Sequence, residues 1–302
     1  MMLTTKDTFF AAREAEAATA TAAAAVPVQA RACGARSLSP EERERLQRDS
    51  ALVAEFKQTK LEQEARRNWD LFYKRNSTRF FKDRHWTTRE FQELGACRES
   101  ENQRLVILEA GCGVGNCLFP LLEEDPNIFV YACDFSPRAV DFVKSNPLYS
   151  KERCLAFQCD LTQNSLVENV PEGTVDAVTL IFVLSAIHPD NMDAALHNIY
   201  KVLKPGGRVL FRDYGLHDHA MLRFKPGHKL SENFYVRQDG TRAYFFSDDV
   251  VEKLFIGTGY VVLENEYVVR KTVNIKEGLS VPRIFIQGKF QKPSGDEHKP
   301  AS

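Results

Sequence analysis

Residues 105–115 read LVILEAGCGVG, an apolar run that leads directly into a loop with glycine at every second position. The run predicts a buried strand, and the glycines predict a tight turn whose main chain a ligand can approach closely. A helix is expected from Asn116 onward. A strand, a glycine loop and a helix in this order are typical of sheets that bind a nucleotide-containing cofactor at the ends of their strands.

The alternation of apolar runs and helical segments continues along the chain. Four more runs predict buried strands: IFVYACD (128–134), CLAFQCD (154–160), VDAVTLIFVL (175–184) and RVLFRDY (208–214). Helices are expected after Ser136-Pro137, over 191–203 and from Ser247. Continuously apolar strands between helices predict a mostly parallel sheet covered on both faces. The runs 260–269 and 283–290 predict a closing antiparallel pair, which completes an α/β, Rossmann-like sheet of seven strands.

The segments outside this pattern define the domain organisation. The alanine-rich residues 1–36 are expected to form a disordered tail, with a targeting segment as the alternative, and 293–302 a second disordered tail. Within the N-terminal helical region 37–103, Ser39, Pro40 and Glu42 make a helix start, and the helix is expected to run to about Arg67. The main domain is then 104–292, with an insertion at 215–246.

The overall composition excludes several classes of protein. The 302 residues include 40 Lys and Arg against 41 Asp and Glu, so net charge does not indicate a nucleic-acid or membrane partner. The seven cysteines contain no CxxC pair, which argues against a disulfide framework and a structural zinc site. No metal is expected, and a reducing compartment, the cytoplasm or nucleus, is favoured. The longest apolar run, 177–184, is too short to span a bilayer.

Local charge is more informative than the total. Residues 66–90 carry eight basic and three acidic side chains with aromatic residues between them, and 212–246 carry six basic and four acidic ones. The segment between them, 104–211, has eight basic and thirteen acidic side chains. Basic segments with aromatic residues suit phosphate contacts and stacking on bases, with solvated surface as the plain alternative. The candidate RNA-binding residues are Arg75, Arg79, Lys82, Arg84, Arg237 and Arg242.

The residues around the glycine loop favour one cofactor. A dinucleotide-binding loop has a sixth-position glycine where this chain has Asn116, and the acidic Glu109 precedes the loop. A carboxylate there suits a ligand that carries an ammonium group. Asp134 and Asp160 end the next two strands, where they can accept hydrogen bonds from ribose hydroxyls and an adenine amino group. Together with Gly111, Gly113 and Gly115, these residues indicate S-adenosylmethionine, and a nicotinamide-dependent oxidoreductase is the alternative.

At this point the chain resembles the class I S-adenosylmethionine-dependent methyltransferases over about 104–290. The resemblance is carried by EAGCGVG, the strand-end Asp134, CDLT around Asp160, and LKPGGRVLF. A narrower group is more similar still, namely the methyltransferase-like enzymes that form 3-methylcytidine in the anticodon loop of tRNA. Its motifs are NWDLFYKRNSTRFFKDRHW (68–86), LSAIHP (184–189), FRDYG (211–215) and YVRQDGTRAYFF (235–246).

The resemblance implies a substrate, a partner and further cofactor contacts. The short N-terminal region is similar to the branch of the family that acts on serine tRNAs at position 32, with help from seryl-tRNA synthetase. Leu161 and Ile181 are implied as cofactor contacts, and Trp69 and Tyr73 as residues that close over the cofactor. From the residues alone, these two aromatics are equally an i, i+4 pair that packs a helix onto the core.

Methyl transfer to N-3 of cytidine does not require a strong catalytic base. Cytidine N-3 has a free lone pair at neutral pH, so catalysis can depend on positioning and electrostatics without a strong base. Asp213 is the first candidate for a group near the acceptor base, and His188 and Arg212 are candidates that orient it; each also has a structural interpretation. A methyltransferase with a protein or small-molecule acceptor and a non-catalytic RNA-binding module are the alternatives.

Overall fold

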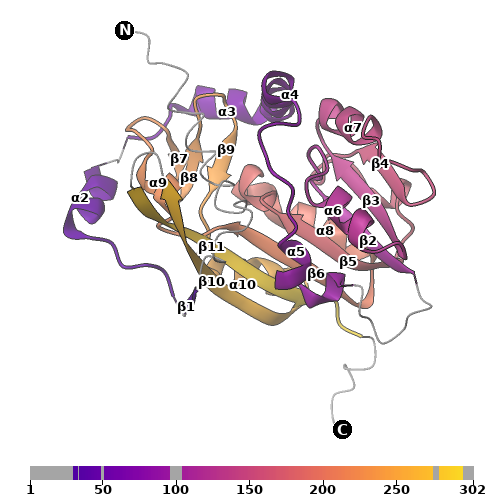
Figure 1. Cartoon of the computed structure of the whole chain (residues 1–302). Coiled ribbons are helices and arrows are strands. Elements are labelled where there is room, and N and C mark those ends of the chain that lie inside the picture. Colours follow the sequence, from indigo (N-terminus) through magenta and orange to yellow (C-terminus); the bar gives the residue numbers. More distant parts are fainter. Residues whose placement is uncertain (1–29, 33, 49–50, 96–103, 275–278, 295–302) are drawn as a thin grey trace.

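A mixed sheet forms the centre of the computed structural model, which describes residues 30–32, 34–48, 51–95, 104–274 and 279–294 (Figure 1). Its strands run in the order β1-β10-β11-β6-β5-β2-β3-β4. The strands β2 to β6 pair in parallel, and β11, β10 and β1 are added antiparallel. Their bounds are β1 (Ala30–Ala32), β2 (Leu105–Ala110), β3 (Ile128–Asp134), β4 (Cys154–Gln158), β5 (Val175–Ile181), β6 (Leu203–Tyr214), β10 (Val261–Asn274) and β11 (Leu279–Gln291).

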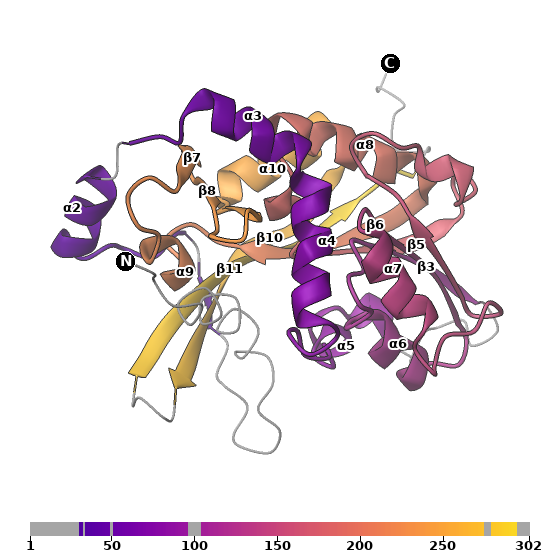
Figure 2. The same ribbon diagram turned by 90° about the horizontal axis from the view of Figure 1, so that it is seen from above.

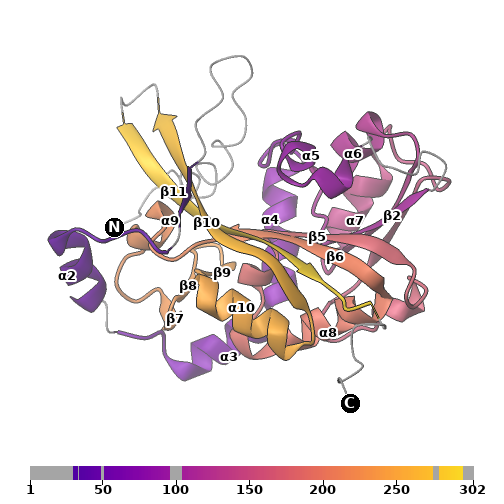
Figure 3. The ribbon, with the colours of Figure 1, turned by 90° about the horizontal axis from the view of Figure 1, so that it is seen from below.

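Helices cover both faces of the sheet, as the continuously apolar strands predict (Figures 2 and 3). Helices α6 (Leu118–Glu124) and α7 (Pro137–Lys144) pack on one face in one apolar cluster. Helices α8 (Met192–Val202) and α10 (Asp248–Gly257) pack on the other in a second cluster. The class I, Rossmann-like fold is thereby confirmed, with β1 as an eighth strand beside the seven that the sequence predicts. No helix in the described part of the chain is long and apolar enough to cross a membrane.

The short strand β1 lies inside the range 1–36 that the sequence analysis assigned to a disordered tail, and for Ala30–Ala32 that prediction is wrong. The strand pairs with the outer edge of β10, and Arg31 forms an ion pair with Glu266. Its Ala-Arg-Ala sequence carries no strand signal, because an edge strand of three residues is added mainly by backbone pairing that any residue can make. Residues 1–29 lie outside the described residues, as do 295–302 of the second predicted tail.

The N-terminal region is helical but broken. It contains α2 (Pro40–Arg48), α3 (Glu55–Gln63), α4 (Ala65–Asn76) and α5 (Thr87–Glu90). The predicted helix start is confirmed, since the Glu42 N–H donates to Ser39 Oγ at 3.2 Å and the Ser39 N–H to Glu42 Oε2 at 2.9 Å. A single helix to Arg67 is wrong. The Val53 N–H instead donates to the carbonyl of Lys229 at 2.8 Å, so this residue pairs with the insertion and not with a preceding helical turn.

The insertion 215–246 forms a small unit at one end of the main sheet. It contains α9 (His219–Leu222) and a three-stranded antiparallel sheet made of β7 (Lys229–Ser231), β8 (Phe234–Val236) and β9 (Arg242–Tyr244). An apolar cluster joins this sheet to the start of α3. The insertion and α7 lie on opposite sides of α4 (Figure 2).

Candidate functional site

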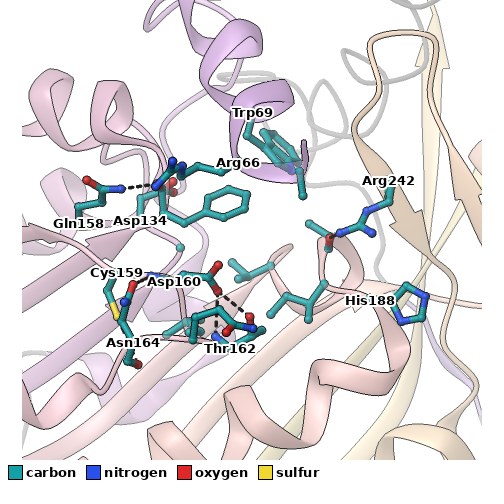
Figure 4. A pocket seen from close by; sticks show the side chains of 18 of the residues that line it. Arg66, Trp69, Asp134, Gln158, Cys159, Asp160, Thr162, Asn164, His188 and Arg242 are labelled. Atoms are coloured by element: carbon teal, nitrogen blue, oxygen red, sulfur yellow. Dashed lines mark hydrogen bonds between the residues drawn. The ribbon is translucent and has the colours of Figure 1, made fainter. Parts of the chain in front are cut away.

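A cavity of about 500 Å³ lies at the carboxyl ends of the parallel strands (Figure 4). The loops after β2, β3, β4 and β5 line it from the sheet, and α3 and α4 line it from the opposite side. Strand β2 pairs with β3 on one side and β5 on the other, so the order of the strands reverses here. Open parallel sheets bind their ligands at such a switch point.

The glycine loop brings the main chain close to this cavity. Gly111 and Gly113 both have positive φ, +67° and +54°, which other residues adopt with strain. A Cβ at Gly111 would stand 2.5 Å from the Val183 side chain, and one at Gly113 would stand 3.0 Å from the Tyr73 hydroxyl. A side chain at either position would therefore fill the space that separates the glycine loop from Val183 and Tyr73.

Asp134 fixes the loop and faces the cavity. Its Oδ2 accepts from the Gly113 N–H and its Oδ1 from the Ser136 N–H, both at 2.9 Å. Burial raises the pKa of Asp134 to about 6, although backbone N–H donors oppose the shift. Each carboxylate oxygen keeps a lone pair beyond these bonds, so the group can still accept from a ligand.

Asp160 lies across the cavity from α4 (Figure 4). Its Oδ1 accepts from the Thr162 N–H and hydroxyl at 2.9 and 2.7 Å, which fixes the carboxylate at the end of β4. Leu161 lines the same cavity, and Ile181 lines a smaller adjoining one. The structure thus brings these predicted cofactor residues together with Asp134.

Helix α4 lies between the insertion and α7 (Figure 2), and its side chains line the cavity. The Asn68 side chain donates to the carbonyl of Gly240 in the insertion at 3.2 Å. Asp70 accepts from the Ser136 hydroxyl at 3.0 Å, at the start of α7. On this helix, Trp69 and Tyr73 line the cavity, where the aromatic residues that close over the cofactor were expected.

Glu109 lies beneath the glycine loop and lines neither cavity, so this placement does not support the predicted direct contact with a ligand. It is 4% exposed, and its Oε2 has no hydrogen-bond partner among the described residues. Burial raises the pKa of Glu109 to about 8, and the positive charge of Arg84 opposes that shift. With its pKa raised to about 8, the carboxyl group is mostly uncharged at neutral pH, so it does not by itself attract a cationic ligand.

Glu109→Gln is expected to remove a pH-dependent part of the free energy of unfolding. Between its ordinary pKa of 4.5 and the raised pKa of about 8, the folded protein holds a proton on Glu109 that the unfolded chain has released. Stability therefore falls as pH rises through this window, by up to about 1.4 kcal/mol per pH unit, and glutamine has no such proton. Denaturant unfolding of both proteins from about pH 6 to about pH 8 measures this; parallel pH profiles would contradict it.

The predicted catalytic residues Asp213 and Arg212 line neither the larger nor the smaller cavity, so this structure does not support a place for them beside an acceptor base, and their catalytic role stays a prediction. Asp213 is fully buried and accepts from the N–H groups of Ser185 and Tyr214 at 2.9 and 2.8 Å. It therefore positions the loop after β5. Arg212 lies over the Trp86 ring at 4.6 Å, and its pKa is lowered to about 9 by burial.

His188 remains at the rim of the larger cavity (Figure 4). Its Nδ1 accepts from the Asp190 N–H at 3.3 Å, and its ring packs edge-on against Phe234 at 5.5 Å. It does not line the smaller cavity beside the glycine loop. A role in orienting a substrate at the rim stays a prediction.

The predicted RNA-binding residues fall into two groups. Arg84, Arg237 and Arg242 line the smaller cavity, and Arg242 also pairs with Glu62 of α3. The remaining residues are exposed at the end of α4 and in the segment after it: Arg75, Arg79 and Lys82. Arg75 additionally faces the carboxylate of Asp239 at 3.7 Å.

Several cavity-lining residues were not predicted from the sequence, among them Arg66, Phe135 and Gln158. Phe135 follows the strand-end Asp134, and Gln158 is the last residue of β4, so position relative to the strand ends could have identified both. The Gln158 side chain donates to the carbonyl of Phe135 at 3.2 Å. Arg66 precedes Trp69 by one helical turn, and this spacing was its only signal. No cluster of three or more metal-ligating side chains is found within the described ranges.

Comparisons with known proteins identify the family to which this chain belongs. A family model described as a methyltransferase domain matches residues 108–209. The human tRNA N(3)-cytidine methyltransferase METTL6 is 70% identical over 265 residues, which cover 88% of this chain and 93% of the human protein. The chain belongs to the tRNA N(3)-cytidine methyltransferases. The Schizosaccharomyces pombe tRNA N(3)-methylcytidine methyltransferase trm140 is 42% identical over 228 residues, covering 75% of this chain and 74% of its own length.

A solved structure supports the fold of this tRNA N(3)-cytidine methyltransferase. The S-adenosylmethionine-dependent methyltransferase from Anabaena variabilis is 12% identical, with a TM-score of 0.53, and the match covers 75% of this chain and 94% of that one. Family membership excludes the nicotinamide-dependent oxidoreductase that the glycine loop alone left open.

The site of this tRNA N(3)-cytidine methyltransferase also fits S-adenosylmethionine. A Cβ at Gly111 or Gly113 would fill the space beside the glycine loop, so glycine at these positions leaves room for a ligand. The carboxylate of Asp134 keeps lone pairs that can accept hydrogen bonds from hydroxyl groups. Asp160 lines the same cavity. The hydroxyl and amino groups of an adenosine are the chemical features that these two hydrogen-bond acceptors suit.

Proposed function

We propose that this chain transfers a methyl group from S-adenosylmethionine to N-3 of cytidine 32 in the anticodon loop of serine tRNAs. The reaction rests on one observation, the 70% identity over 88% of the chain to a human tRNA N(3)-cytidine methyltransferase. The choice of serine tRNAs, and of seryl-tRNA synthetase as partner, follows the resemblance of the chain to one branch of the family.

The residues around the larger cavity hold the cofactor in this proposal. When bound, S-adenosylmethionine supplies a methyl group on a positively charged sulfur. Asp134 accepts hydrogen bonds from the ribose hydroxyls, and Asp160 from the adenine amino group. Trp69 and Tyr73 cover the site from α4 and exclude water.

The smaller cavity, of about 60 Å³, is the proposed site of the acceptor base. It adjoins the glycine loop and shares Gly111 and Tyr73 with the larger cavity. No carboxylate or imidazole is among the described residues that line it. This lining suits N-3 of cytidine, because a nitrogen with a free lone pair needs to be positioned but not deprotonated. Since N-3 lies on the Watson–Crick edge, the cytidine must be unpaired and turned out of its stack.

The proposal is tested by mass spectrometry of nucleosides from serine tRNA after incubation with the purified chain and S-adenosylmethionine. Parallel reactions with and without seryl-tRNA synthetase measure its contribution. We expect 3-methylcytidine at position 32, and at least a tenfold faster reaction with the synthetase. Equal rates on other tRNAs would overturn the serine specificity, equal rates without the synthetase would overturn its role, and failure to form 3-methylcytidine would overturn the proposed function.

Arg79→Glu is expected to weaken tRNA binding and to reduce its dependence on salt. Arg79 is exposed within the basic segment 66–90. Each phosphate contact contributes about 0.7 to 0.9 to the slope of log affinity against log salt, so the loss of one contact should lower the slope by that amount. Anisotropy titrations of labelled tRNA over a salt series measure the slope.

The matched control for this experiment is Lys151→Glu. Lys151 is an exposed lysine that precedes β4 at the far edge of the sheet. Affinity for S-adenosylhomocysteine should stay within twofold of wild type in both variants. Binding of tRNA that does not respond to salt would instead favour a methyltransferase with a protein acceptor.

A further inference from the structure

A third cavity, of about 390 Å³, lies on the insertion, outside the cofactor site. It is bordered by α2, by the end of β6, by the segment between α9 and β7, and by the turn after β8. We call it the insertion groove. Its lining residues include Arg45, Tyr214, Ala220, Arg223, Phe224, Lys225, His228, Arg237, Gln238 and Phe245.

The insertion groove is cationic. Arg45, Arg223, Lys225 and Arg237 line it, and no carboxylate is among its described lining residues. The chain as a whole has almost equal numbers of acidic and basic residues, so this local excess is a specific feature of the groove. Guanidinium and ammonium groups gathered in a concave surface bind phosphate groups.

The floor of the groove is aromatic. The half-buried Phe224 ring stacks on Tyr235 with ring centres 4.8 Å apart and an interplanar angle of 18°. The Phe245 ring packs edge-on against the Phe224 ring at 6.2 Å, which fixes its orientation. A fixed aromatic ring beside cationic side chains can stack on a nucleobase while the cations contact its phosphate.

The groove adjoins the proposed site of the acceptor base. Tyr214 and Arg237 line both the insertion groove and the smaller cavity beside the glycine loop. Arg237 is held between them, since its Nη1 donates to the carbonyl of Arg242 at 2.9 Å and its guanidinium lies 5.8 Å from the Tyr214 ring centre. A strand whose target base enters the smaller cavity therefore meets the insertion groove next.

We propose that the insertion groove binds a single-stranded nucleotide that flanks the methylated cytidine, with its phosphate on Arg223 and Lys225 and its base on Phe224. The proposal rests on the proposed function, because it requires an RNA whose acceptor base occupies the smaller cavity. The volume of the groove lies within the range of small-ligand sites, roughly 300–1,000 Å³.

Two variants test the groove. The double variant Arg223→Glu/Lys225→Glu removes the phosphate contacts, and Phe224→Ala removes the stacking surface. For the double variant we expect at least tenfold weaker binding of a labelled anticodon stem–loop RNA, and a salt slope reduced by about 1.4 to 1.8, the value for two contacts. For Phe224→Ala we expect binding about fivefold weaker or more, with an unchanged salt slope.

Integrity of the variants is measured separately, by their affinity for S-adenosylhomocysteine, which should match wild type. Lys151→Glu controls for the change of charge. RNA affinity and salt slope equal to those of the control would overturn the proposal. So would a defect that is present only when seryl-tRNA synthetase is added, because the groove would then bind the protein partner. If wild type binds the stem–loop but forms no 3-methylcytidine, the proposed function fails, whereas methylation by wild type with unaffected variants overturns the groove alone.

Discussion

Asp134→Ala is expected to lower the affinity for S-adenosylhomocysteine by about 100-fold. The carboxylate holds the glycine loop through the Gly113 N–H and offers its remaining lone pairs to two ribose hydroxyls. Hydrogen bonds to a charged group contribute about 1.5–3 kcal/mol each, so the loss of the two ligand bonds alone accounts for an effect of this size. Calorimetric titration measures it directly.

The same carboxylate predicts how cofactor binding responds to pH. Burial raises the pKa of Asp134 to about 6, and the ionised form is the acceptor. Affinity in the wild type should therefore be steady above about pH 7 and fall about tenfold per pH unit below about pH 5. Asp134→Asn serves as the control, because it keeps the shape but has no titration in this range. Unchanged affinity in a folded Asp134→Ala would remove this residue from the site.

The grouping of the candidate cofactor residues could be predicted from the sequence because each of them lies at the end of a parallel strand. Parallel strands end at one edge of the sheet, so Asp134, Asp160 and the glycine loop must meet wherever that edge lies. No tertiary detail is needed beyond the strand boundaries. The same reasoning could have extended to Phe135 and Gln158, which share those boundaries.

The role of strand β6 could not be predicted in this way. Asp213 and Arg212 lie near the end of a strand that also points to the site, yet neither side chain lines a cavity: the buried carboxylate accepts from two backbone N–H groups and the guanidinium lies on Trp86. Which partner a strand-end polar group meets depends on the loop from the neighbouring strand. Only the folded chain brings Ser185 to Asp213.

The N-terminal region shows a second limit of sequence patterns. Its charge and helix start were informative, but the break before α3 depends on the pairing of Val53 with Lys229, far away in the chain. A second long-range contact joins the Asn68 side chain to the carbonyl of Gly240. In the smaller cavity, Arg84 comes from the N-terminal region, whereas Arg237 and Arg242 come from the insertion. Composition identified both segments as basic, but it could not show that these arginines lie together.

A serine tRNA with uridine in place of cytidine 32 is expected to give no detectable methylation. Uridine N-3 carries a proton at neutral pH, and an enzyme that methylates it needs a group to accept that proton. The smaller cavity offers no carboxylate or imidazole for this purpose among its described lining residues, which include Arg84, Arg237 and Arg242. Cytidine N-3 needs no such acceptor.

The comparison is made with purified protein, seryl-tRNA synthetase, a labelled methyl donor and both tRNAs. With cytidine, the rate should be nearly flat from about pH 7 to about pH 9, because no proton leaves before the methyl group is transferred. An oligonucleotide that pairs with the loop should lower the rate sharply, since unpairing and unstacking add a few kcal/mol to the barrier. Equal methylation of the uridine and cytidine loops would contradict transfer to N-3 of cytidine. A rate that rises tenfold per pH unit would instead show that a deprotonation precedes the transfer, and the acceptor atom would then have to be sought elsewhere on the base.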